Sequence, residues 1–187
     1  MLRAMHMNSF RERIINLIYK VATGSKKVRR ILTPLLGFAF FCVVLFLIII
    51  SFYLDRYFGF PEFVFKPYTT FVALLFFIPG VISWLWSAGK FFKTKGTPVP
   101  INPPPILVTD GPYAYSRNPM LTGLFLVMAG IGIFCGSITL TFIMTPLFIF
   151  MSILEFKYIE EPELTKRFGD EYTKYKERTP IIIPKIH

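Results

Sequence analysis

Three long stretches without a charged side chain constrain this chain more than any other feature. Residues 31–54, 67–89 and 118–154 contain no Asp, Glu, Lys or Arg. A helix rises about 1.5 Å per residue, so about 20 apolar residues cross the ~30 Å hydrocarbon core of a bilayer. Since 53% of all residues are hydrophobic, the sequence predicts an integral membrane protein.

The lengths of these stretches predict an all-α fold with about four transmembrane helices. The third stretch has 37 residues, more than one crossing needs, and Gly132, Gly136 and Ser137 lie near its middle. We therefore expect a helical hairpin there, with each arm short for a full span. The expected helices are 31–53, 67–88, 119–134 and 138–156.

The net charge of +10 is concentrated beside the apolar stretches. Residues 1–31 hold eight Lys or Arg against one Glu, and residues 87–119 hold four against one Asp. Such segments are typical of the cytoplasmic flanks of membrane helices. We expect a multi-pass membrane protein with both termini in the cytoplasm. Nucleic acid is not expected as a partner, because the sequence contains no soluble module to bind it.

The charge pattern divides the chain into three parts. Residues 1–30 form a basic amphipathic N-terminal segment, which the pattern predicts either as a helix on the membrane surface or as a frayed flank. Residues 31–95 hold the first two transmembrane helices. Residues 96–187 hold a long loop, the hairpin and a C-terminal amphipathic helix on the cytoplasmic side. The apolar face of that helix consists of Leu164, Phe168, Tyr172 and Tyr175.

The loop that begins at Gly96 is the most unusual segment, because prolines, glycines and tyrosines precede a single arginine. Arg117 stands where the hairpin begins, and its guanidinium either snorkels to the interface or binds a carboxylate or phosphate. Glu160 and Glu161 either favour a helix N-terminus or accept hydrogen bonds from a ligand. Both histidines are close to the chain ends, and the sequence predicts no metal site.

Two motifs in the second half of the chain resemble a known family. The run GTPVPxxPPxxLVxxGPYxxxRNPM occupies residues 96–120, and the pattern EExxLxxxFGxxYxxY occupies residues 160–175. Both are similar to the isoprenylcysteine carboxyl methyltransferase and phospholipid methyltransferase superfamily, in its bacterial-type members. The two motifs occur in the order of the family and on both sides of the predicted hairpin.

The resemblance implies an enzyme that transfers a methyl group from S-adenosylmethionine to a lipid or lipid-like acceptor at the cytoplasmic membrane face. Arg117 and Glu161 are then the expected catalytic residues. Asn118 stands where the prenylcysteine enzymes have histidine, and Leu121 stands where a tyrosine is usual. The expected cofactor-binding residues are Tyr113, Tyr115, Arg117, Asn118, Pro119, Gly123, Glu160, Glu161, Tyr172 and Tyr175.

Two other functions remain open at this point. A membrane reductase of the sterol-reductase type would have a similar C-terminal architecture and would use NADPH. A non-catalytic membrane scaffold would use the basic N-terminal segment to bind anionic lipid.

Overall fold

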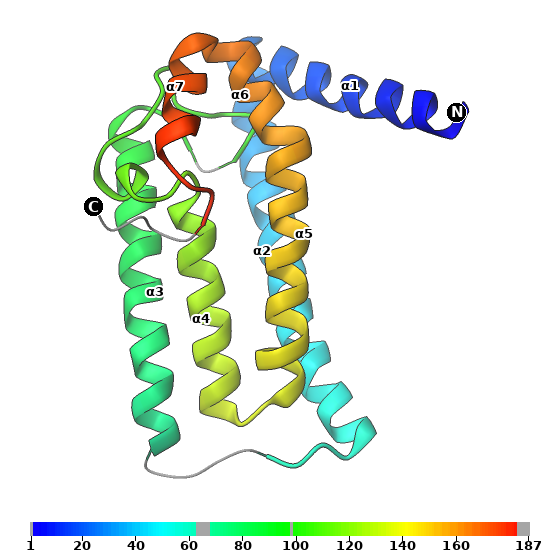
Figure 1. Cartoon of the computed structure of the whole chain (residues 1–187), viewed down its shortest axis with the longest axis vertical. Helices are drawn as coiled ribbons and strands as arrows, with labels where there is room; N and C mark the ends of the chain where they lie inside the picture. The colour runs from blue at the N-terminus through cyan, green and yellow to red at the C-terminus, as the bar shows by residue number, and fades with distance from the viewer. Residues whose placement is uncertain (1, 63–67, 98, 183–187) are drawn as a thin grey trace.

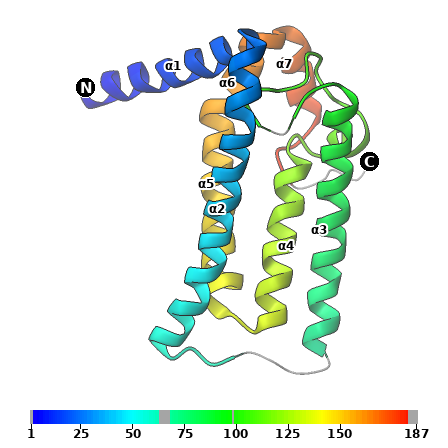
Figure 2. The ribbon, with the colours of Figure 1, turned by 180° about the vertical axis from the view of Figure 1, so that it is seen from behind.

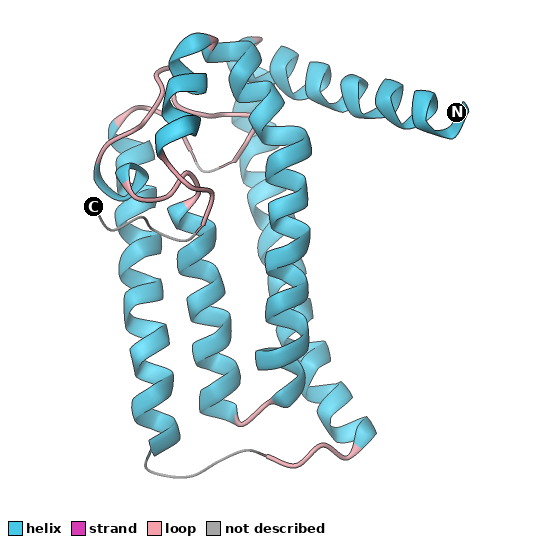
Figure 3. Ribbon diagram, viewed as in Figure 1, coloured by secondary structure: helices cyan, strands magenta, loops and turns pink. Residues whose placement is uncertain are grey.

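The computed structural model describes residues 2–62, 68–97 and 99–182. These residues form helices and connecting loops, without a strand among them (Figure 3). The all-helical fold predicted from the sequence is therefore confirmed. The helices are α1 (Leu2–Thr23), α2 (Lys26–Phe58), α3 (Tyr68–Lys93), α4 (Pro119–Cys135), α5 (Thr145–Glu155), α6 (Glu161–Phe168) and α7 (Asp170–Arg178). Shorter elements are the 3₁₀ turn η1 (Gly111–Ala114) and the π-helical segments η2 (Thr139–Met144) and η3 (Phe156–Glu160).

Three helical stretches of the described chain are long and apolar enough to cross a membrane. They are α2, α3 and the continuous stretch Thr139–Phe168, which runs from η2 through α6. The fourth apolar helix, α4, has 17 residues, about 25 Å at the usual rise. The multi-pass architecture is confirmed, with three full-length candidates in place of about four.

The long helices lie side by side, and α1 leaves the bundle at a steep angle (Figure 1). The view from behind shows the same arrangement, with α6 and α7 at the end of the bundle where α1 ends and α2 begins (Figure 2). At the opposite end, Asp55 of α2 accepts a hydrogen bond of 2.9 Å from the backbone N–H of Thr139. Ser137 also donates to this carboxylate. Asp55 thus caps the start of the last long helix from a neighbouring one.

Several of the observed helix ends lie beyond the predicted ones. The first transmembrane helix was expected to start after the basic run at residues 26–30, whereas α2 begins at Lys26. Backbone hydrogen bonding continues past the apolar stretch, because long basic side chains can reach water from a helix end. The helix stops at Gly59, whose φ of 64° is the left-handed conformation that ends many helices.

The second arm of the hairpin and the start of the C-terminal helix form one rod rather than two helices. The sequence predicted an end near Phe156, but the helix continues without a break to Phe168. The ring of a proline clashes with the carbonyl four residues earlier. For Pro146 that carbonyl lies in η2, and for Pro162 it lies in η3. The wider π turns accommodate both prolines without breaking the rod.

The single amphipathic helix predicted at the C-terminus is divided. Gly169 has φ 55° and ψ −130°, a combination that is strained for residues with a side chain. The chain turns there, and α7 packs back over the end of the bundle (Figure 1). Tyr172 and Tyr175 are thereby buried on the inner face of α7.

Glycines allow α3 and α4 to lie in direct backbone contact. A Cβ on Gly80 would lie 2.7 Å from the carbonyl oxygen of Gly123, and a Cβ on Gly123 would lie 2.6 Å from the carbonyl oxygen of Gly80. Small residues at such crossings let membrane helices approach closely. The hydroxyl of Ser83 donates to the carbonyl of Pro119 over 2.9 Å. These contacts fix where α4 begins, and therefore where Arg117 lies.

We expect Gly80→Ala to destabilise the protein, because the new methyl group overlaps the backbone of α4. Overpacking of this kind costs roughly 1–3 kcal/mol. The matched control is Gly89→Ala on the same helix, where a Cβ would meet nothing within 4 Å in the described structure. Apparent melting temperatures in detergent should fall for Gly80→Ala alone. Equal melting temperatures for both variants would show that the α3–α4 contact is not tight.

Candidate functional site

The loop between α3 and α4 folds over the end of the bundle instead of crossing it as a plain linker. At its start, Lys95 has a φ of 59°, and Gly96 lies so close to Pro104 that a Cβ would be 2.3 Å from its nitrogen. The backbone N–H of Thr97 donates to the carbonyl of Asn102 over 2.8 Å. The prolines at 100, 103 and 104 then line a cavity beneath the loop.

The end of this loop is tied to the chain beyond α7. The backbone N–H of Arg117 donates to the carbonyl of Pro180 over 2.8 Å, and that of Asn118 donates to Ile181 over 3.1 Å. The Ser116 hydroxyl also donates to the Ile181 carbonyl, over 2.7 Å. The residues that immediately precede α4 are therefore hydrogen-bonded to residues 63 or more positions later in the sequence.

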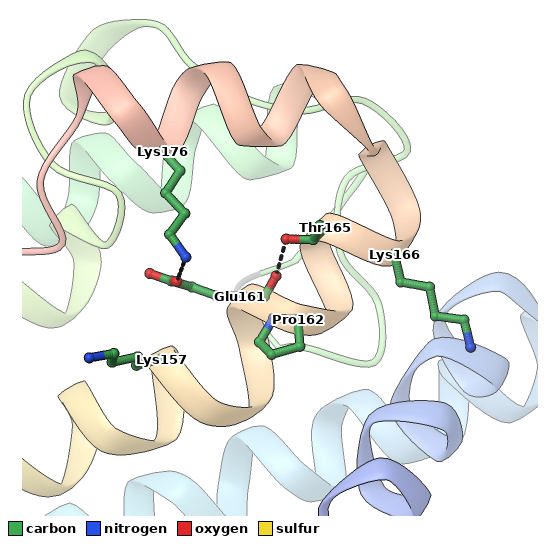
Figure 4. A pocket seen from close by; sticks show the side chains of 6 residues that line it. All are labelled: Lys157, Glu161, Pro162, Thr165, Lys166 and Lys176. Atoms are coloured by element: carbon green, nitrogen blue, oxygen red, sulfur yellow. Dashed lines mark hydrogen bonds and ion pairs between the residues drawn. The ribbon is translucent and has the colours of Figure 1, made fainter.

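A buried ion pair lies at the centre of the site. Arg117 Nη1 donates to Glu161 Oε1, and the two side chains are 7% and 4% exposed. Lys176 of α7 approaches the other oxygen, Oε2 (Figure 4). Glu161 therefore joins the loop, the long rod and α7. Breaking a buried pair from one side typically costs about 3–5 kcal/mol, because the remaining charge stays buried.

Aromatic side chains surround the guanidinium. The ring centroid of Phe156 lies 5.8 Å from the Arg117 guanidinium carbon, within the range of a cation–π contact. Arg117 Nη1 lies 3.4 Å from the hydroxyl of Tyr172. The Tyr175 hydroxyl donates to the backbone carbonyl of Tyr113 over 2.6 Å. The Tyr113 ring stacks on Phe91 at a centroid distance of 5.0 Å.

Burial raises the pKa of Tyr113, Tyr172 and Tyr175 above the usual range of a phenol. Carboxylates add to this effect, Glu160 at Tyr113 and Glu161 at Tyr172, whereas Arg117 opposes it at Tyr172. These hydroxyls are therefore neutral at physiological pH. That of Tyr175 donates to the Tyr113 carbonyl, and that of Tyr172 accepts from Arg117.

The cavity under the loop has a volume of about 70 Å³. Within the described chain, the Nε of Arg117 is buried and has no hydrogen-bond partner. Glu160 also lines the cavity. The cavity is thus mostly apolar and aromatic, with two guanidinium groups, those of Arg117 and Arg167, and one carboxyl group. Its lining residues are Phe91, Thr97, Val99, Pro100, Pro103, Pro104, Ile106, Leu107, Val108, Tyr113, Arg117, Phe156, Glu160, Leu164, Arg167, Phe168, Tyr172 and Tyr175.

The structure brings together about half of the residues predicted from the sequence. Those that line the cavity are Tyr113, Arg117, Glu160, Tyr172 and Tyr175.

The other predicted site residues lie outside the cavity lining. Tyr115 is 53% exposed. The Asn118 side chain caps α4 by accepting a hydrogen bond of 3.2 Å from the backbone of Leu121. Pro119 and Gly123 lie in the contact between α3 and α4, and Glu161 pairs with Arg117 from outside. Their predicted contacts with a cofactor stay predictions.

Sequence reasoning missed three residues that belong to the site. Lys176 lies one helical turn after Tyr172, so the spacing already placed both on one face of α7. Phe156 and Arg167 gave no comparable signal. Phe156 was interpreted as the last residue of a transmembrane helix. Arg167 was interpreted as part of the charged face of the C-terminal helix. Their positions depend on the π turn η3 and on the unbroken rod.

Comparison with protein families identifies the family of this chain. The model of the phospholipid methyltransferase family matches residues 68–171, which include α3, the cavity loop, the hairpin and the start of α7. The chain belongs to the phospholipid methyltransferase family. Members of this family are membrane methyltransferases that use S-adenosylmethionine. The resemblance found in the two sequence motifs is therefore confirmed.

A curated relative agrees with this family assignment. The chain is 37% identical over 87 residues to a protein-S-isoprenylcysteine O-methyltransferase of Schizosaccharomyces pombe. That alignment covers 43% of this chain and 34% of the relative. This chain thus spans about a third of the length of the curated relative. No solved structure matches the chain significantly.

We expect Tyr175→Phe to loosen the loop over the cavity, because it leaves the buried carbonyl of Tyr113 without its donor. The expected loss of folding free energy is about 1–3 kcal/mol. Tyr158→Phe is the matched control, since Tyr158 is 47% exposed. Limited proteolysis in detergent should cleave residues 97–116 faster in Tyr175→Phe than in the control. Equal cleavage rates would contradict a role of this hydrogen bond in closing the loop.

Proposed function

We propose that this protein transfers a methyl group from S-adenosylmethionine to a lipid or lipid-like acceptor at the cytoplasmic membrane face. The observation that carries the proposal is the aromatic cavity at the Arg117–Glu161 pair. It lies at one end of an apolar helix bundle. Membership of a family of membrane methyltransferases supports the reaction class.

The lining chemistry fits the cofactor. The unpartnered Nε of Arg117 would hold its carboxylate, because guanidinium binds carboxylates strongly. Glu160 would accept from the amino group or from the ribose hydroxyls. Phe156 and the buried tyrosines offer ring faces to the adenine and to positive charge. When bound, S-adenosylmethionine supplies an electrophilic methyl group on a sulfonium.

The residues of this chain contribute positioning and exclusion of water. An in-line displacement gains most from holding the reacting groups in line in a dry site. The loop, Phe156 and the tyrosines of α7 line the cavity and would exclude solvent around a bound cofactor. Ligand cavities usually measure about 300–1,000 Å³, so a cavity of about 70 Å³ has to widen before the cofactor binds.

We also propose four membrane crossings, namely α2, α3, α4 and the rod from Thr139. The apolar α4 lies against α3 and would cross with local thinning of the bilayer. The end of the bundle that carries α1 and α7 is also the end with the basic residues of α2 and α3 (Figure 1). By the positive-inside rule, this charge distribution supports a cytoplasmic location for this end, the site and both termini.

Binding of S-adenosylhomocysteine tests the proposed site. We expect isothermal titration of the detergent-purified chain to show binding, and Arg117→Lys to weaken it by about tenfold. Lysine keeps the positive charge but lacks the second guanidinium contact. Glu161→Ala should weaken binding as well, while Lys174→Ala on the exposed face of α7 should leave it unchanged.

Each possible result has a defined meaning. Absence of binding to folded wild-type protein would overturn the methyltransferase proposal. Wild-type affinity in both Arg117→Lys and Glu161→Ala would overturn the site assignment alone. Tighter binding of NADPH than of S-adenosylhomocysteine would favour a reductase. Labelled methyl transfer into a total lipid extract, followed by mass identification of the product, would then identify the acceptor.

A further inference from the structure

A second cleft lies on the outer side of the buried ion pair. It has a volume of about 390 Å³ and opens to the surface beside the junction of the rod with α7. Glu161 and Pro162 form part of its wall. The lining residues are Lys157, Glu161, Pro162, Thr165, Lys166 and Lys176 (Figure 4).

The cleft has more basic than acidic side chains in its lining. It has three lysines, and its single carboxylate, Glu161, is already shared by Arg117 and Lys176. Lys157 and Lys166 do not pair with a carboxylate in the described structure. Lys166 instead donates to Asn16 over 2.7 Å and lies 4.5 Å from the ring centroid of Tyr19. The cleft therefore has positive charge that no acidic group of the described chain neutralises.

The position of the cleft indicates where a matching anion comes from. Lys157 is two residues beyond α5, and the apolar stretch before it has no charge from residue 118 to residue 154. A lysine at the end of such a stretch lies at the level of the lipid headgroups. α1 leaves the bundle sideways at the same end (Figure 1), and its Phe10 and Leu17 are more than 60% exposed.

We propose that this outer cleft binds the phosphate group of a membrane lipid. Lys157 contacts the phosphate from the membrane side, and Lys176 contacts it from α7. The Lys166 ammonium points away from both of them, toward α1 (Figure 4), and lines the cleft without contacting the phosphate. Ammonium groups bind phosphate as strongly hydrated point charges, with three donors each. The acyl chains extend along the exposed apolar surface of α5. The site is separate from the inner cavity, because the Arg117–Glu161 pair stands between them.

The test measures binding of lipid to the purified chain in detergent, by titration with phosphatidic acid. Diacylglycerol supplies the same acyl chains without phosphate, and inorganic phosphate supplies the anion without acyl chains. We expect phosphatidic acid to bind at least about tenfold more tightly than either. We expect Lys157→Glu to weaken this binding by about tenfold, because an ammonium contact is replaced by repulsion.

Lys174→Glu is the matched control. It changes the net charge equally, and Lys174 is exposed on α7 but does not line the cleft. Equal losses in both variants would overturn the proposal, since general surface charge would then explain the binding. Equal affinity for inorganic phosphate would overturn the lipid as its source, and equal affinity for diacylglycerol would overturn phosphate recognition.

A second variant distinguishes loss of lipid binding from a folding defect. Lys157→Gln removes the charge without introducing repulsion, and we expect it to weaken phosphatidic acid binding by a smaller factor than Lys157→Glu. Wild-type lipid affinity in both variants would overturn the proposal. Binding of S-adenosylhomocysteine is measured on the same samples. Because the proposal does not rest on methyl transfer, each of the two bindings can fail without the other.

Discussion

The buried ion pair between Arg117 and Glu161 is the interaction on which the rest of the site depends. Two charges removed from water are expensive unless further partners satisfy them. Lys176 and Tyr172, both on α7, supply these partners. The pair therefore stabilises one particular arrangement of the loop, the rod and α7. It also forms the wall between the inner cavity and the outer cleft.

The unbroken rod from Thr139 to Phe168 connects the membrane to this pair. Its apolar part is fixed in depth by the bilayer, and its polar end carries Glu160 and Glu161 without an intervening hinge. Two prolines would ordinarily interrupt such a helix. Each follows a π turn that widens the backbone at the carbonyl that its ring would otherwise strike. Phe156, the first residue of the π turn η3, contacts Arg117.

Sequence reasoning predicted most of the architecture but only part of the site. The physical reasons for these two outcomes are different. Lipid cannot satisfy backbone polar groups, so long stretches without charge must be helices. Helix boundaries were less accurate, because basic side chains let α2 continue into the headgroup region. The two motifs identified the family, yet Tyr115 and Gly123 lie outside the cavity lining. A motif marks residues that occur together without showing which of them face the ligand.

The sequence alone determined the class of protein, the helical fold and the two segments that meet at the site. These follow from hydropathy, charge distribution and local motifs, which act over a few turns of helix. Only the tertiary structure decided that Lys176 shares Glu161 with Arg117, that Gly169 turns α7 back, and that a basic cleft lies outside the pair. These features depend on contacts between residues far apart in the chain, and local sequence patterns do not specify such contacts.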